Sequence, residues 1–250
     1  MADQPRQLTA PPRSAARLLQ YHDLSESIVS ALDARDTYTA SHSNRVAEMV
    51  LVLAAALGLG PDETTLIHIA AHLHDIGKIA VSDAVLRKAG PLTADEWQEM
   101  RRHPVTGYNI LRRVADFQDI AVLVLHHHER WDGQGYPDGL SGADIPLGSR
   151  IIAVADSIDA MMSSRSYRAA MTGAACRCEI EKNSGIMYDP RVASAALAHW
   201  DTLISRYAAN TPRAPYFDRL MLERTRQTHD YLVAHQDSRI TLAELAAMFH

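Results

Sequence analysis

The chain has 250 residues, of which 47% are hydrophobic, and its formal net charge is -5 with an isoelectric point near 6.2. This hydrophobic content excludes a disordered chain and is sufficient for a buried core. The acidic balance argues against non-specific binding to duplex nucleic acid, which requires a basic surface. The two cysteines, Cys176 and Cys178, lie two residues apart, so in a helix they diverge and we expect no internal disulfide.

The N-terminal residues 1–20 are polar and contain three prolines, which predicts a flexible tail. They lack the apolar stretch of a signal peptide. The longest apolar run, residues 46–59, contains Glu48 and is too short to cross a bilayer. We therefore expect a cytoplasmic protein that does not bind membranes.

Apolar residues recur at helical spacing along most of the chain. "LTADEWQEM" carries Thr93 and Glu96 at the spacing of a capping box, and Pro190 stands in the first turn of another apolar segment. We expect helices over 14–34, 44–57, 61–77, 92–100, 114–129, 150–164, 189–200, 216–235 and from Thr241. Alternating strand patterns are not evident, so the predicted fold is an all-α helical bundle over residues 21–200, with a C-terminal helical extension over 201–250.

Residues 130–148 interrupt the helical pattern with five glycines and two prolines. Glycine permits a positive φ and proline fixes φ, so this loop is predicted to be ordered but irregular. It follows three consecutive histidines, 126–128. Trp131 and Tyr136 within it could stack on a base or pack the loop, and the sequence favours neither reading.

Thirteen histidines occur in the chain, and several lie beside carboxylates. A single histidine is more often a hydrogen-bonded core or surface residue than a ligand, and we give that reading to His72 and His126. Taken together, however, the remaining candidates supply about the number of donors that two ions need. Imidazole with carboxylate and without thiolate suits catalytic iron, manganese or zinc. The candidate donors are His42, His74, Asp75, His103, His127, His128 and Asp156.

The sequence resembles the HD-GYP family, a branch of the HD-domain metal-dependent phosphohydrolases. The resemblance covers about residues 30–200. It is carried by "HDIGK" at 74–78, "HHERWDGQGYP" at 127–137 and "IPLGSRIIAVADSIDAMMSSRSYR" at 145–168, with "VLRKAGPLTADEWQEMRRHPVTGYNIL" and "SGIMYDP" in support. The "HHERWDGQGYP" string is specific, whereas the His–Asp pair alone is a weak signal.

The resemblance implies an all-α hydrolase of cyclic di-GMP with two divalent ions, which we expect to be iron or manganese. All seven candidate donors match the family's metal ligands, and Asp75 would bridge the ions. Lys78 matches a lysine beside the scissile phosphate, and Arg165 and Arg168 match residues that hold the substrate phosphates. The GYP residues are Gly135, Tyr136 and Pro137. A hydroxide held between the cations would attack phosphorus in line with the departing 3′-oxygen.

Some members of the family carry a glutamate four residues before the first histidine ligand, where it helps to hold a third metal. That position is Tyr38 here. We therefore expect a two-metal site whose main product is pGpG, with slow further cleavage to GMP.

Two alternatives remain: a phosphodiesterase for another cyclic dinucleotide, and a non-catalytic module that binds cyclic di-GMP or a diguanylate cyclase. A GGDEF-type cyclase docking on the GYP loop is the candidate protein partner. The helix at 14–34 and the C-terminal extension are candidate homodimer interfaces, although both patterns also suit packing on their own domain.

Overall fold

The computed structural model describes Ser25, residues 28–29, 42–163 and 169–208. The chain divides into two compact units, residues 1–208 and 209–250, and every described residue lies in the first. Tyr38, Arg165, Arg168 and the predicted helices at 216–235 and from Thr241 fall outside the described residues, and so does most of the helix predicted at 14–34.

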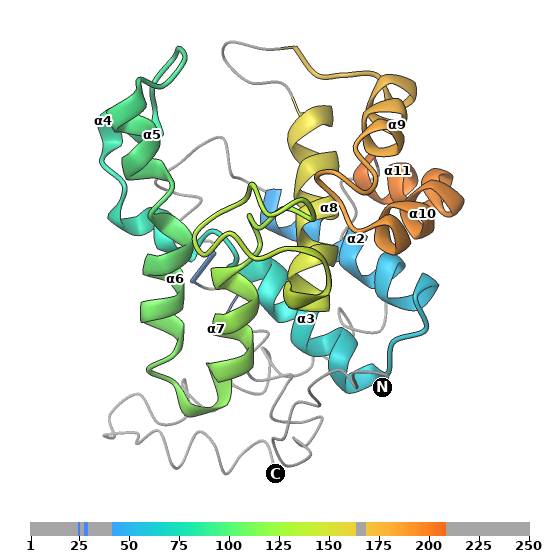
Figure 1. The fold of residues 1–250 in the computed structure, drawn as a ribbon, viewed down its shortest axis with the longest axis horizontal. Coiled ribbons are helices and arrows are strands. Elements are labelled where there is room, and N and C mark those ends of the chain that lie inside the picture. The colour runs from blue at the N-terminus through green and yellow to red at the C-terminus, as the bar shows by residue number, and fades with distance from the viewer. Residues whose placement is uncertain (1–24, 26–27, 30–41, 164–168, 209–250) are drawn as a thin grey trace, which may run out of the picture. The chain divides into compact units, whose positions relative to one another are not determined.

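The described part of the chain is helical, as predicted, and contains no strand (Figure 1). Its α-helices are α2 (His42–Ala56), α3 (Pro61–Leu73), α4 (Asp83–Leu86), α5 (Ala94–Met100), α6 (His103–Leu111), α7 (Gln118–Leu125), α8 (Leu147–Met162), α9 (Gly173–Lys182), α10 (Pro190–Ala198) and α11 (Trp200–Ala208). Short 3-10 turns are η1 (Ile76–Ala80), η2 (Ala115–Phe117) and η3 (Gly142–Asp144). None of these helices is long and apolar enough to cross a membrane.

Several helix ends follow from local sequence. Thr93 and Glu96 form the predicted capping box at the start of α5. Asp189 caps α10 by accepting a hydrogen bond from the backbone N–H of Arg191, and Pro190 occupies the first helical position. The side chain of Thr172 caps α9 in a similar way.

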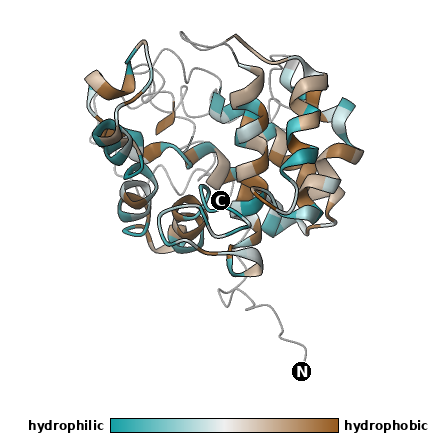
Figure 2. Ribbon diagram, turned by 45° about the horizontal axis from the view of Figure 1, so that its top comes forward, coloured by the Kyte–Doolittle hydropathy of each residue, from teal (hydrophilic) through white to brown (hydrophobic). Residues whose placement is uncertain are grey.

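The core lies where α2 packs against α3 and α8, with α7 against α3 (Figure 1). Helices α9, α10 and α11 cover the α2–α8 side, and α6 packs against α7 and η1. Most helices carry both hydrophobic and hydrophilic residues along their length, as amphipathic helices around one core do (Figure 2). The largest fully buried side chains include Met49, Leu53, Ile69, Ile151 and Ile158.

Two predicted helices end earlier than expected. The helix expected to reach Gly77 ends at Leu73, and the chain continues as η1 from Ile76. A Cβ atom on Gly77 would lie 1.8 Å from the carbonyl oxygen of His103, so only glycine lets η1 approach α6 this closely. The helix expected over 114–129 spans only Gln118–Leu125, so the three consecutive histidines follow the helix rather than lie in it.

Candidate metal centre and active site

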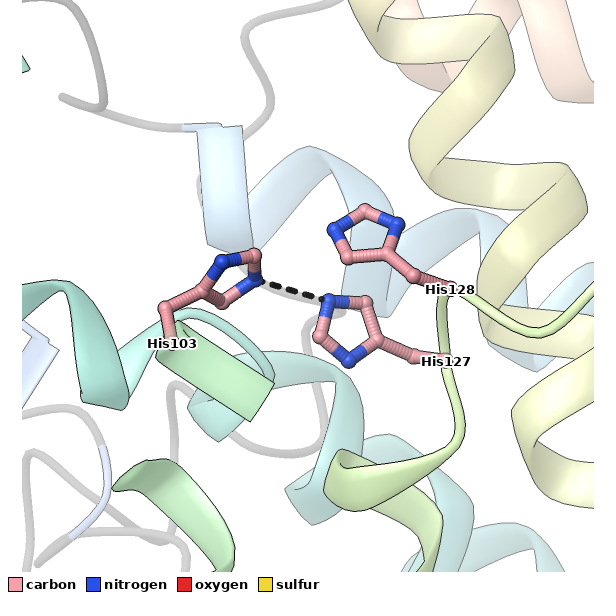
Figure 3. A group of neighbouring side chains, drawn as sticks. All are labelled: His103, His127 and His128. Atoms are coloured by element: carbon pink, nitrogen blue, oxygen red, sulfur yellow. Dashed lines mark hydrogen bonds between the residues drawn. The ribbon is translucent and has the colours of Figure 1, made fainter. Parts of the chain in front are cut away.

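Two groups of potential metal ligands come together at the ends of these helices. One group is His42, His74 and Asp75, and the other is His103, His127 and His128; within each, the ligand atoms lie within 4.8 Å of one another. All except His128 are buried. Figure 3 shows the second group, with the ring of His103 facing that of His127. Four separate segments of the chain therefore converge on one small volume.

Asp75 links the two groups. Its Oδ2 atom lies 3.4 Å from Nε2 of His74 and 3.7 Å from Nε2 of His42, whereas Oδ1 lies 3.4 Å from Nε2 of His103. Asp156, from α8, adds an oxygen 3.4 Å from Nε2 of His42. A carboxylate with one oxygen toward each group has the arrangement that a bridging ligand needs.

Backbone carbonyls fix how three of the histidines are oriented. The Nδ1 atom of His74 lies 2.7 Å from the oxygen of Ala71, that of His103 2.8 Å from Met100, and that of His127 2.6 Å from Val124. A carbonyl oxygen only accepts, so each Nδ1 is the protonated nitrogen of its ring. In the neutral rings the unprotonated Nε2 atoms therefore face the centre of the site.

The spacing of these Nε2 atoms fits bound cations. His103 Nε2 and His127 Nε2 are 3.3 Å apart, and both rings donate through Nδ1. Two neutral rings in this arrangement direct lone pairs at each other, which is unfavourable unless a cation lies between them. His42 Nε2 and His74 Nε2 are similarly 3.2 Å apart. The donor set matches the imidazole and carboxylate ligands of two divalent ions.

Burial and charge tune the protonation of the donors. Burial lowers the pKa of His103 to about 4 and, together with the neighbouring histidines, holds the pKa values of His127 and His128 well below 6.5. Burial opposes ionisation of Asp75, but Lys78 and His74 outweigh it and hold its pKa well below the usual value. Neutral imidazoles around an ionised carboxylate are the forms that bind metal.

His42 differs from His74, His103 and His127 because its Nδ1 atom contacts a carboxylate instead of a backbone carbonyl. Its Nδ1 atom lies 2.6 Å from Oδ2 of Asp159, a buried residue of α8, and Arg45 donates to both oxygens of that carboxylate. Burial lowers the pKa of His42, but the hydrogen bond to Asp159 and the charge of Asp156 outweigh it, so the pKa is raised. Asp159 and Arg45 were not predicted from the sequence. The available signal was the position of Asp159, three residues after Asp156 in an apolar helix.

Lys78 stands at the edge of the centre. Its Nζ atom lies 2.5 Å from Oδ2 of Asp75, and its side chain is one quarter exposed. The η1 turn places this ammonium group beside the Asp75 carboxylate. A cation at this point can stabilise charge on a phosphoryl oxygen that approaches Asp75.

The loop over residues 130–148 contains Gly135, Tyr136 and Pro137 and is called the GYP loop. It packs against His128. The backbone N–H of Tyr136 donates to the carbonyl of His128, and the two rings lie 4.9 Å apart at 31°. Glu129 anchors the loop because its Oε1 atom accepts hydrogen bonds from the N–H groups of Asp138 and Gly139. A Cβ atom on Gly135 would lie 2.3 Å from the backbone nitrogen of Arg130, so no other residue fits there.

His72 and His126, two of the histidines that were not expected to be ligands, lie outside both groups. Nε2 of His72 is 3.2 Å from Nε2 of His68, one turn earlier in α3, and Nε2 of His126 is 3.0 Å from Oδ2 of Asp138. The predicted phosphate-binding Arg165 and Arg168 fall outside the described residues. In the GYP loop, Tyr136 packs against His128, whereas the guanidinium of Arg150 lies over Trp131.

Comparisons with known proteins agree with this geometry. The family model of the HD domain matches residues 26–192. The chain is 44% identical over 172 residues to the cyclic di-GMP phosphodiesterase response regulator RpfG of Xanthomonas campestris, covering 68% of this chain and 46% of the relative. It is 38% identical over 185 residues to 3'3'-cGAMP-specific phosphodiesterase 2 of Vibrio cholerae, covering 73% and 35%. The chain thus spans less than half the length of these relatives.

A solved structure shares the fold. It is an HDG"Y"P protein from Bdellovibrio bacteriovorus, matched with a TM-score of 0.57 at 16% identity over 75% of this chain and 66% of that one. At this identity the similarity concerns the arrangement of helices alone.

Proposed function

The chain belongs to the HD-GYP branch of the HD-domain family, and from this premise we propose that it is a metal-dependent phosphodiesterase that hydrolyses cyclic di-GMP to pGpG. The observation that carries the proposal is the position of Asp75 between two groups of histidines, four of which have their outer nitrogens held by backbone carbonyls or by Asp159. The substrate assignment rests on relatives that are named for cyclic dinucleotides.

In the proposed reaction, some residues would hold the metal ions and another would bind the scissile phosphate. When bound, two divalent ions supply Lewis acidity and lower the pKa of the attacking water. His42, His74, His103, His127, His128 and Asp156 would hold the ions, with Asp75 between them. Lys78 would bind a non-bridging oxygen of the scissile phosphate and offset the charge that grows on it.

The bond broken is the one between phosphorus and the ribose 3′-oxygen. Water adds to phosphorus, the 3′-oxygen leaves and takes up a proton, and the product is a linear dinucleotide with a 5′-phosphate. In this proposal Arg165 and Arg168 help to hold the phosphates, and Gly135, Tyr136 and Pro137 form the wall of the site. Iron and manganese are the proposed ions, as the membership of the HD-GYP branch implies; the donor set without thiolates suits catalytic ions and not a structural zinc site.

A second candidate substrate is 3'3'-cGAMP. It is favoured by the 38% identity to a Vibrio cholerae enzyme specific for that nucleotide, whereas the 44% identity to RpfG favours cyclic di-GMP. The two molecules share the same phosphodiester backbone, so the metal centre serves both equally. The choice between them depends on contacts to one base.

The decisive experiment incubates the protein, loaded anaerobically with Fe(II) or Mn(II), with each cyclic dinucleotide and resolves the products over time. We expect cyclic di-GMP to give pGpG, with GMP appearing slowly, because Tyr38 replaces the third-metal glutamate of some relatives. Faster cleavage of 3'3'-cGAMP than of cyclic di-GMP would identify 3'3'-cGAMP as the preferred substrate. A three-metal count with rapid release of GMP would contradict the two-metal proposal.

The control is the Asp75→Asn protein, which should lose activity with both nucleotides. If the wild-type protein holds two ions and binds cyclic di-GMP without cleaving any cyclic dinucleotide, the non-catalytic binding module becomes the better description. Docking of a GGDEF-type cyclase on the GYP loop stays a prediction, to be tested by pull-down with a loop variant.

A further inference from the structure

Arg101 occupies a place at the rim of the centre that its sequence context does not reveal. It follows α5 directly, two residues before His103, and its side chain is exposed. The guanidinium carbon lies 5.2 Å from the centre of the Tyr136 ring, which in turn lies 4.9 Å from the ring of His128. A single aromatic ring therefore separates Arg101 from the second group of ligands.

Arg101 also brings a positive charge to the rim of the centre, beside the Tyr136 ring. A positive charge in this position attracts an anion that approaches the metal centre.

Arg101 has hydrogen-bonding capacity to offer such an anion. Three arginines near the site pair with carboxylates and so have donors already engaged: Arg45 with Asp159, Arg130 with Asp132, and Arg150 with Asp189. Across the described residues no carboxylate pairs with Arg101. A guanidinium that lies over an aromatic ring without a carboxylate partner keeps N–H donors available, and their fork matches a phosphate.

We propose that Arg101 binds the phosphate of the cyclic dinucleotide that is not being cleaved. This inference rests on the proposed function, since only a substrate with two phosphates has such a group. One phosphate would occupy the metal centre beside Lys78, and the small macrocycle keeps the other close by. Arg101 supplies a cation from the α5–α6 junction, on the side of the site that Tyr136 lines.

The test compares two neighbouring arginines in the Mn(II)-loaded full chain. Arg101→Ala removes the proposed contact, and Arg102→Ala is the matched control, because Arg102 is also exposed and lies one residue further along. Each protein is assayed with cyclic di-GMP and with bis(p-nitrophenyl) phosphate, a diester with one phosphate. Metal content and thermal unfolding are measured in parallel.

We expect Arg101→Ala to raise KM for cyclic di-GMP by about 10- to 100-fold, the loss typical of a charge-assisted hydrogen bond, with little change in kcat. Hydrolysis of the one-phosphate diester should be unchanged. Arg101→Lys should recover part of the affinity, because it keeps the charge but not the fork. Arg102→Ala should match the wild type with both substrates.

Two results would overturn the inference while leaving the proposed function intact. The first is an unchanged KM for cyclic di-GMP in Arg101→Ala. The second is an equal loss with both substrates, because it would mean that Arg101 only supports Tyr136 and His128. A wild-type protein that cleaves the simple diester but no cyclic dinucleotide would instead overturn the proposed function, and this inference with it.

Discussion

Substituting Gly77 by alanine tests whether the close contact between η1 and α6 sets the geometry of the metal centre. The added Cβ would lie 1.8 Å from the carbonyl oxygen of His103 and 2.7 Å from the backbone nitrogen of Gly107. Both obstacles are backbone atoms, so no side chain can rotate away. Restoring an ordinary contact requires a displacement of roughly 1 Å or more between η1 and α6 in a closely packed interior.

That displacement is large on the scale of metal coordination. Asp75 precedes η1 and His103 begins α6, and their facing atoms are 3.4 Å apart. Ligand distances tolerate only about 0.2 Å, so the two residues would no longer serve one ion. We expect Gly77→Ala to lose at least one of two ions and about 1–3 kcal/mol of unfolding free energy, the usual cost of overpacking.

The assay combines metal analysis after dialysis, Mn(II) titration by calorimetry and urea unfolding of the metal-free protein. Gly90→Ala is the matched control, because nothing lies within 4 Å of a Cβ at that position. The control should bind two ions with wild-type affinity. If Gly77→Ala also binds two ions with unchanged affinity and stability, the contact does not set the site and the reasoning fails.

Three further predictions concern individual groups of the site. Asp159→Asn should weaken Mn(II) binding about 10- to 100-fold, because His42 and Arg45 both lose a charged partner; calorimetry measures this, and unchanged affinity would contradict it. The metal-free protein should be less stable at pH 5 than at pH 7 by about 2 kcal/mol because of His103. The pKa of His103 is about 4 in the folded protein and about 6.5 in the unfolded chain, so the unfolded chain binds more protons as the pH falls. His42 acts in the opposite sense, but the three histidines with lowered pKa values outweigh it, and urea titrations that show greater stability at pH 5 would refute this sign. Lys78→Met should reduce kcat for cyclic di-GMP about 100-fold with both ions retained; loss of an ion would show instead that the lysine serves Asp75.

The helical fold could be predicted from the sequence because helices depend on local patterns, and the candidate donors could be named because short sequence motifs carry most of them. Apolar periodicity predicts several of the helices, although α4, α6, α9 and α11 were not among those expected, and the Thr93–Glu96 pair marks the start of α5. The early end of α3 could not be predicted in this way, because the position of Gly77 depends on its contact with His103, 26 residues further along.

The supporting residues of the site were missed for a related reason. In the sequence, Asp159 looks like one more polar residue of an amphipathic helix. Its contacts with His42 and Arg45 form only because α8 packs against α2. In the sequence, Arg101 looks like a solvent-exposed charge. Its proposed role depends on the GYP loop, which places the Tyr136 ring beside the guanidinium. Both roles depend on contacts between segments distant in sequence, which periodicity does not report.

The carbonyls that orient His74, His103 and His127 have a second effect, because they belong to the last turns of α3, α5 and α7. The final carbonyls of a helix carry its negative macrodipole end. Three such ends converge here around an ionised carboxylate, and together they favour the binding of cations at the centre. In the proposed function this field favours binding of the ions before the phosphate of the substrate, because the ions offset the negative charge that the phosphate would otherwise meet.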